Sequence, residues 1–250
     1  MNSTLTYEKP QIIRLVTGLM NKYGLTRGVP AQRICERIDG VPVEKLVKDH
    51  GSPLFVFSER TIVRTVRRAR QAFAQRYPSV VLGWSYKTNY LQAICALMHR
   101  EGSIAEVVSQ MEYDKARKLG VPGDQIVFNG PYKPLAALRR AVAEGAMIHA
   151  DHQDELDDLA VIAAERGEIL AVGLRLNLDA GIHPQWTRFG LNLETGQALA
   201  AVEKMAQGGR LRLAGLHCHI GTYILDPTAY ARQVEKRNGS TCLRCPGAPT

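Results

Sequence analysis

A lysine stands directly after a short apolar run, in the segment Ser85-Tyr86-Lys87-Thr88-Asn89. A lysine at the end of a buried strand is costly unless its charge is paired or its amine is used chemically. One interpretation is a side chain that extends to solvent at the rim of a sheet. The other is an amine, activated by desolvation, that attacks an aldehyde and forms a Schiff base. The segment alone leaves both open.

Two histidines, His217 and His219, end a later apolar run and are followed by Gly221-Thr222. Residues two apart on a strand point to the same face, so both imidazoles share one side of it. They fit half of a metal site, an aromatic surface for a flat cofactor, or histidines held in the core. The backbone N–H groups and the hydroxyl of Gly221-Thr222 are suited to a phosphate beside them, which favours a ligand role.

Further polar side chains fall at the ends of other apolar runs: Glu106, Asn129, Asp151 and Arg175. Arg175 shares its strand face with Asn177. Arg188 lies in the long loop that follows and fits a ligand-binding arginine and a surface arginine equally well.

The elements that must position these residues alternate regularly along the chain. Apolar runs predict strands at residues 80–86, 103–108, 125–128, 146–149, 169–178 and 213–220. Helical periods separate them, at residues 91–98, 111–119, 135–143, 156–162 and 197–205. This spacing predicts an α/β fold of βα units with a parallel sheet, either doubly wound or a (β/α)8 barrel. No Gly-x-Gly-x-x-Gly turn follows the first strand, and the polar residues gather at the strands' carboxyl ends, so we favour an incomplete barrel with about six βα units.

The chain divides into three predicted parts. Residues 1–50 form an N-terminal helical extension, with one helix started by Pro10 and a short one over residues 43–49. Residues 51–236 form the barrel domain, which opens with a strand at residues 52–57 and a helix capped by Ser58. Residues 237–250 form an unstructured tail. Its Cys-x-x-Cys has no second ligand pair nearby, so we expect no metal site.

Composition excludes several classes of function. The chain has 250 residues, 45% of them hydrophobic, and a formal net charge of +8, which is typical of a folded protein. The densest run of arginines lies off the apolar stripe of its predicted helix, so we expect a solvated face and no nucleic-acid partner. No apolar run is long enough to cross a membrane, and the first residues do not resemble a secretory signal. The odd count of five cysteines argues against a disulfide framework, so we expect a cytoplasmic protein.

Taken together, residues 40–236 resemble the pyridoxal-phosphate-dependent ornithine/diaminopimelate/arginine decarboxylases, which share the alanine-racemase-like barrel. The segments that carry the resemblance follow one another along successive strands: Gly51 to Phe57, Tyr86-Lys87-Thr88-Asn89, Glu106 to Ser109 with Glu112, Ile126 to Gly130, Arg175-Leu176-Asn177, Arg188 to Leu191 and His217 to Thr222.

The resemblance implies a pyridoxal 5'-phosphate cofactor and a decarboxylation like that of diaminopimelate decarboxylase, on a basic or diamino acid. It implies that Lys87 holds the cofactor as a Schiff base and that His219 stacks on its ring. Gly221 and Thr222 would bind the phosphate, and Arg175 would lie in a network beneath the ring. Glu106 stands where the family usually has the shorter Asp. The intact family forms homodimers.

Some parts of the family pattern do not follow Thr222: the glycine-rich phosphate loop, the Glu facing the pyridine nitrogen and the C-terminal β-domain. We therefore expect a C-terminally truncated decarboxylase with exposed first and sixth strands and poor catalysis. The alternatives are a racemase, a single-barrel pyridoxal-phosphate-binding protein, or a non-catalytic partner of an intact decarboxylase.

Overall fold

The computed structural model describes residues 20–21, 24–25, 35–77, 79–182 and 185–239, and its central element is a curved parallel sheet. Neighbouring strands follow the order β5-β6-β7-β8-β9-β11, each parallel to the next. Their bounds are β5 Gly83–Ser85, β6 Ile104–Val107, β7 Ile126–Phe128, β8 Met147–Ala150, β9 Leu170–Asn177 and β11 Leu211–Cys218. The short β10 (Leu191–Asn192) pairs with the end of β9. The six predicted strands and their parallel order are confirmed.

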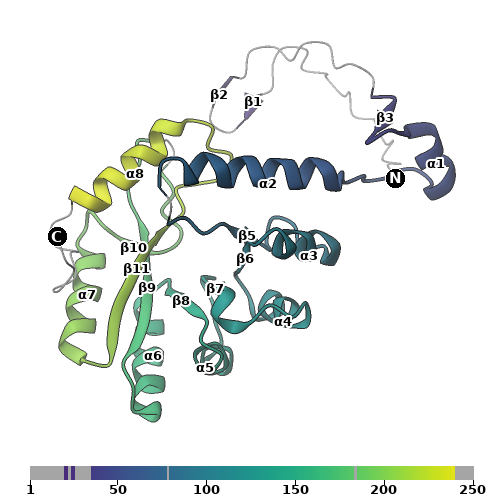
Figure 1. Cartoon of the computed structure of the whole chain (residues 1–250). Helices are drawn as coiled ribbons and strands as arrows, with labels where there is room; N and C mark the ends of the chain where they lie inside the picture. The colour runs from purple at the N-terminus through teal and green to yellow at the C-terminus, as the bar shows by residue number, and fades with distance from the viewer. Residues whose placement is uncertain (1–19, 22–23, 26–34, 78, 183–184, 240–250) are drawn as a thin grey trace, which may run out of the picture.

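The helices connect these strands and cover the convex face of the sheet (Figure 1). They are α3 Gln92–Arg100, α4 Gln110–Lys118, α5 Leu135–Ala143, α6 Gln153–Arg166 and α7 Gln197–Gly208, with α2 Glu59–Ala74 before the sheet and α8 Pro227–Gly239 after it. The Ser58 cap is confirmed, because its side chain accepts the Thr61 N–H at 3.0 Å. No helix of the described residues is long and apolar enough to cross a membrane.

Strand alternation sorts the side chains between the two faces of the sheet. On β9, Val172, Leu174 and Leu176 are buried in the main apolar core with residues of the flanking helices. Gly173, Arg175 and Asn177 face the opposite, concave side. The core therefore lies between sheet and helices, which leaves the concave face to the polar residues.

Before the sheet, the short helix predicted over residues 43–49 is confirmed as α1 (Val43–His50), and the other described elements of residues 1–50 are strands in place of the predicted helical extension. These are two-residue strands, β1 Met20–Asn21 with β2 Gly24–Leu25 and β3 Arg37–Ile38 with β4 Val41–Pro42. The predicted helix from Pro10 lies outside the described residues, apart from its last position in β1.

The predicted strand over residues 52–57 is wrong, since this segment has no regular structure. Its apolar side chains stay exposed, with Phe55 at 89% exposure. The structure gives it no neighbouring strand among the described residues, so its backbone has no strand to pair with. At the other end, α8 extends to Gly239, three residues into the predicted tail; residues 240–250 lie outside the description.

Candidate functional site

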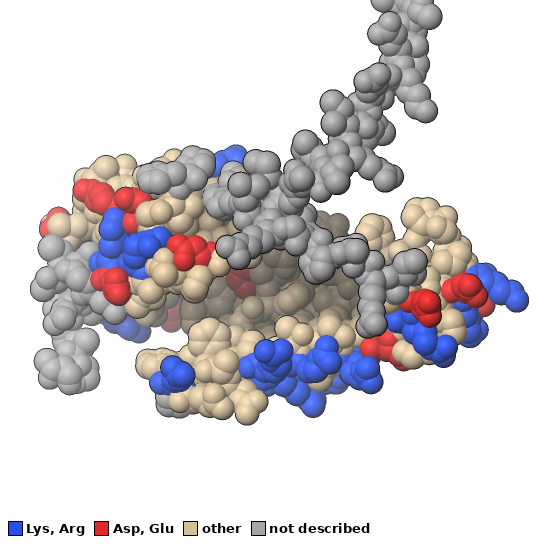
Figure 2. All heavy atoms as spheres, turned by 90° about the horizontal axis from the view of Figure 1, so that it is seen from above, with Lys and Arg blue, Asp and Glu red and all other residues tan. Residues whose placement is uncertain are grey.

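The concave face collects the sequence-predicted polar residues because the strand register places them side by side. Ser85 of β5 lies opposite Glu106 of β6, and Arg175 of β9 lies opposite His217 of β11. Seen from above, the surface of the molecule has a recess in its middle (Figure 2). The carboxyl ends of β5, β6, β9 and β11 thus contribute polar side chains to the concave face, called the cavity below.

Lys87 lies in the turn directly after β5 and is exposed to solvent. Burial raises the pKa of Glu112 and lowers those of His217 and His219; the Lys87 charge opposes the first shift and adds to the other two, so its amine is within electrostatic reach of all three. The preceding Tyr86 is fully buried on the helix side, and its hydroxyl bonds His99 Nε2 of α3 at 2.7 Å. This anchor fixes the backbone beside Lys87 and leaves its amine accessible.

Glu106 is half-buried on β6, and its Oε1 is buried without a hydrogen-bond partner. Ser85 Oγ, on the paired residue of β5, is also buried and unpartnered. Glu112, in the first turn of α4, accepts the Val108 N–H at 2.8 Å. Burial raises the pKa of Glu112, and the Glu106 charge raises it further. Buried polar groups normally have partners, so Glu106 and Ser85 are suited to a polar ligand in the cavity.

Arg175 is buried and forms an ion pair with Asp151, which follows β8, with a 2.8 Å bond from its guanidinium to Oδ1. The guanidinium also lies over the Phe189 ring, 4.9 Å from its centroid. Asn177, two residues further along β9, donates to the carbonyl oxygens of Phe189 (3.2 Å) and Gly190 (2.8 Å). The strand therefore holds the 185–190 segment at two points.

His217 packs against His149 of β8, with ring centroids 5.2 Å apart. Between them on β9 stands Gly173, where an added Cβ would lie only 2.3 Å from His149 Cδ2. Burial lowers the pKa of His149 to about 4, and burial with the His149 and Arg175 charges lowers that of His217 to about 3. Both rings are therefore neutral at pH 7, and the buried Nδ1 atom of each has no hydrogen-bond partner.

His219, just beyond β11, is half-buried and contacts Trp186 edge-on, with centroids 5.7 Å apart at 81°. Trp186 in turn lies 6.5 Å from Phe189. Burial lowers the pKa of His219, and the charges of Lys87 and Arg175 lower it further. A neutral, half-buried imidazole offers a flat face to an aromatic ligand.

Gly221 and Thr222 follow in the turn after β11. Gly221 has φ +144°, a conformation that favours glycine, and Thr222 is exposed. Arg188 is exposed as well, and its guanidinium lies 5.5 Å from the Phe189 centroid. Neither Thr222 nor Arg188 makes a contact that assigns it a ligand.

Sequence reasoning missed three residues of this region: Lys133, His149 and Glu155. His149 could have been found, because it alternates with Asp151 on the same strand face. Lys133 and Glu155 are buried polar residues that form an ion pair of 2.7 Å beneath the strand ends. Their sequence positions, 22 residues apart, carry no signal of that contact. Within the described part of the chain, no group of three or more His, Cys, Asp or Glu residues could hold a metal ion.

The donor set of the cavity fits pyridoxal phosphate better than a metal. It contains an accessible amine, a neutral half-buried imidazole, a buried guanidinium and a carboxylate oxygen without a partner. The amine can react with the aldehyde of pyridoxal phosphate, and the imidazole can stack on its aromatic ring. The guanidinium and the carboxylate oxygen can bind the polar substituents of that ring.

Comparison with known proteins decides the family. The model of the pyridoxal-dependent decarboxylase, pyridoxal binding domain, matches residues 60–241, which is most of the chain and all of the sheet described above. The chain belongs to this family.

Curated diaminopimelate decarboxylases from several organisms are similar to this chain. The protein from Aquifex aeolicus is 32% identical over 208 residues, covering 80% of this chain and 48% of the relative. That from Methanocaldococcus jannaschii is 30% identical over 214 residues, with the same coverage. A crystal structure of the M. jannaschii diaminopimelate decarboxylase in complex with L-lysine superimposes with a TM-score of 0.72 and 28% identity, over 80% of this chain and 49% of that one. The chain thus spans about half the length of the relatives that it matches.

Proposed function

We propose that this chain binds pyridoxal 5'-phosphate on the concave face and provides the cofactor-binding half of a decarboxylase that acts on a diamino acid, diaminopimelate above all. The observation that carries the proposal is the convergence of Lys87, Glu106, Arg175 and His219 at the carboxyl ends of β5, β6, β9 and β11. The cofactor domain of the family and the diaminopimelate decarboxylases among its relatives support it.

Each residue has a role that its surroundings support. Lys87, exposed beside the cavity, would bond the cofactor aldehyde carbon through its amine. His219 would lie against the ring, and its neutral state avoids placing a buried charge there. Arg175, neutralised by Asp151, would place an oriented guanidinium beneath the ring without adding net charge. Glu106 would accept a hydrogen bond at its unpartnered Oε1.

The phosphate would lie near Gly221 and Thr222, where a backbone N–H and a hydroxyl are available. When bound, pyridoxal phosphate supplies the electron sink that decarboxylation requires. The protein's own contribution is to fix the ring, hold the amine nearby and supply charged partners in a partly buried setting.

Chemical labelling tests the assignment of Lys87. The full chain is incubated with pyridoxal phosphate, reduced with borohydride to make the link permanent, digested and mapped by mass spectrometry. We expect the label on Lys87, and Lys87→Ala should abolish it. Label on Lys115, Lys118 or Lys133 instead would overturn the assignment. A chain that takes up no cofactor would favour a non-catalytic partner of an intact decarboxylase.

The proposal includes a homodimer, an amino-acid substrate and a cytoplasmic site of action. Among the described residues, Cys35 and Cys95 form no disulfide bond, as is usual in a reducing compartment. Light scattering coupled to size-exclusion chromatography tests the dimer, for which a mass of about twice 27.6 kDa is expected. Carbon dioxide release from diaminopimelate, compared with ornithine and arginine, tests the substrate.

A further inference from the structure

Beneath the cavity, four buried charged residues are linked by successive contacts across the ends of β7, β8 and β9. Lys133, in the segment between β7 and α5, pairs with Glu155 of α6 at 2.7 Å. The second carboxylate oxygen of Glu155 accepts the backbone N–H of Asp151 at 2.7 Å. Asp151 holds Arg175 at 2.8 Å. All four residues are at most 6% exposed, and their charges cancel.

The series of contacts continues through aromatic rings to His219. The Arg175 guanidinium lies over Phe189, Phe189 contacts Trp186, and Trp186 meets His219 edge-on. A displacement of Asp151 would therefore move the Arg175 guanidinium and, through it, the aromatic surface beside His219.

We propose that Glu155 is a positioning residue for the cofactor face, acting through the Asp151 backbone, with Lys133 as its counter-ion. Its role follows from its two carboxylate oxygens, of which one is held by Lys133 and the other fixes the Asp151 N–H. Burial lowers the pKa of Lys133 and raises that of Glu155, and the charge of each partner opposes the shift of the other. A buried ion pair is weak evidence for stability, because apolar residues often replace one without loss. We therefore assign the pair a role in fixing the position of Asp151 and not in stabilising the fold.

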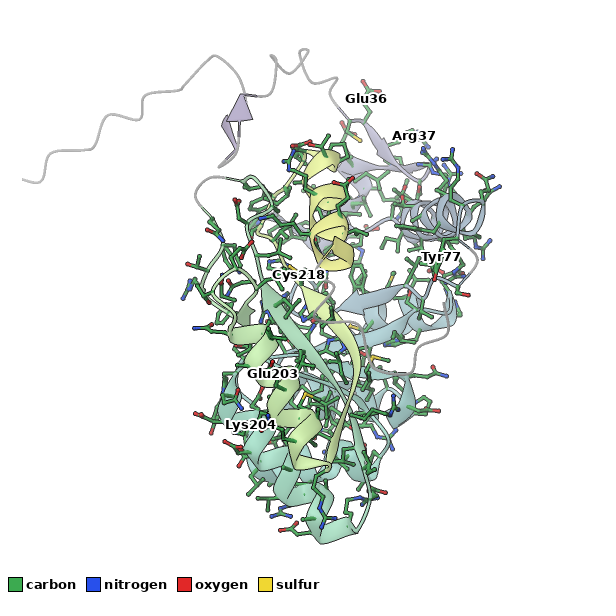
Figure 3. The ribbon with its side chains drawn as sticks, turned by 90° about the vertical axis from the view of Figure 1, so that its left-hand side faces the viewer. Glu36, Arg37, Tyr77, Glu203, Lys204 and Cys218 are labelled. Atoms are coloured by element: carbon green, nitrogen blue, oxygen red, sulfur yellow. The ribbon has the colours of Figure 1, made fainter. Side chains whose placement is uncertain are left out.

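Two double variants separate geometry from stability. Lys133→Met with Glu155→Leu removes the charges and the acceptor for Asp151. Lys133→Met with Glu155→Gln removes the same charges but keeps an acceptor oxygen. The matched control is Lys204→Met with Asp157→Leu, which removes the exposed 2.6 Å pair between α7 and the same helix α6. Figure 3 shows Lys204 on α7, well away from Cys218 at the carboxyl end of β11.

The readout does not require an active enzyme. The chain has two tryptophans, so in a Trp84→Phe background acrylamide quenching of fluorescence reports Trp186 alone, in cofactor-free protein. Equilibrium binding of pyridoxal phosphate is measured in parallel, and circular dichroism verifies folding. This second readout rests on the proposed function, whereas the first does not.

We expect the Glu155→Leu double variant to expose Trp186 to quencher and to weaken pyridoxal phosphate binding by about 2- to 30-fold, the range for residues that modulate coupling between sites. The Glu155→Gln double variant should restore both values, and the control should change neither. Equal behaviour of the Leu and Gln double variants would overturn the proposal.

A third variant covers a failure of the Leu double variant to fold. Glu155→Asp keeps the charge but withdraws the acceptor from Asp151, so it should produce the same change at Trp186. An unchanged Trp186 in Glu155→Asp would overturn the inference. Absence of cofactor binding in the unmodified chain would instead refute the proposed function, while quenching of Trp186 would still decide this inference.

Discussion

Replacing Gly173 by alanine tests whether the paired imidazoles shape the concave face. An added Cβ would lie 2.3 Å from His149 Cδ2 and 2.9 Å from its Nε2. Carbon atoms in contact normally lie about 3.5–4.0 Å apart, so the ring must move by about 1 Å or more. The His149 ring already packs on His217, which limits its movement. We expect a loss of about 1–3 kcal/mol in the free energy of unfolding, the range for overpacked cores.

Urea unfolding of the full chain measures this loss, and a neighbouring glycine supplies the control. Gly215 of β11 lies directly opposite Gly173 in the strand register, and a Cβ there would meet nothing within 4 Å. Gly215→Ala should therefore change stability by no more than about 1 kcal/mol, in either direction. The two substitutions are chemically identical and lie on adjacent strands, so their difference isolates the contact with His149.

A double-mutant cycle assigns the loss to its cause. In a His149→Ala background the clash is absent, so Gly173→Ala should cost about 1–3 kcal/mol less than in the unmodified chain. The reasoning would be refuted by a Gly173→Ala variant as stable as Gly215→Ala, or by a cost that persists without His149.

Three further predictions concern charge. Burial lowers the pKa values of His149 and His217 to about 4 and about 3, so as the pH falls below 6.5 the unfolded chain binds protons before the folded chain does. Urea titrations should therefore show a free energy of unfolding that is constant above pH 6.5 and falls by about 1.4 kcal/mol for each ring with every pH unit below it. The double variant His149→Gln with His217→Gln should flatten this slope. Asp151→Ala leaves a buried guanidinium unpaired and should cost about 3–5 kcal/mol, whereas Lys204→Ala, at an exposed pair, should cost less than about 1 kcal/mol in the same thermal denaturation assay. Lys87 is exposed, so Lys87→Ala should leave the free energy of unfolding within about 0.5 kcal/mol while removing the borohydride label; a larger loss would indicate a structural lysine.

The sequence predicted the sheet well because its signals are local. Each strand is a short apolar run, and each helix carries an apolar period that begins or ends near a glycine or a cap. The predicted strand at residues 52–57 was wrong because a composition rich in aromatic and β-branched residues gives no information about a pairing partner. Phe55 and its neighbours have strand-like composition, but the described chain offers them no adjacent strand.

The positions of the candidate residues were predictable where a residue ends a strand, and unpredictable where a contact joins distant elements. Lys87, Glu106, Arg175 and His219 stand at strand ends, and the parallel order brings strand ends together. The pairing of Lys133 with Glu155 depends on how α6 packs beneath β8, which no local pattern encodes. The contact of Trp186 with His219 depends likewise on the course of the loop after β9.

The polarity of the concave face follows from the same alternation that builds the core. Val172, Leu174 and Leu176 need apolar neighbours, and the helices supply these on the convex side. The intervening positions of the strands face the concave side and need no apolar neighbours. They can therefore carry polar and charged groups, which are costly to bury in an apolar core. Several remain buried without partners, including Glu106 Oε1 and the Nδ1 atoms of the two imidazoles. A buried polar atom without a hydrogen-bond partner costs about 1–3 kcal/mol. A ligand that supplies the missing hydrogen bonds removes this cost, and its binding is strengthened accordingly.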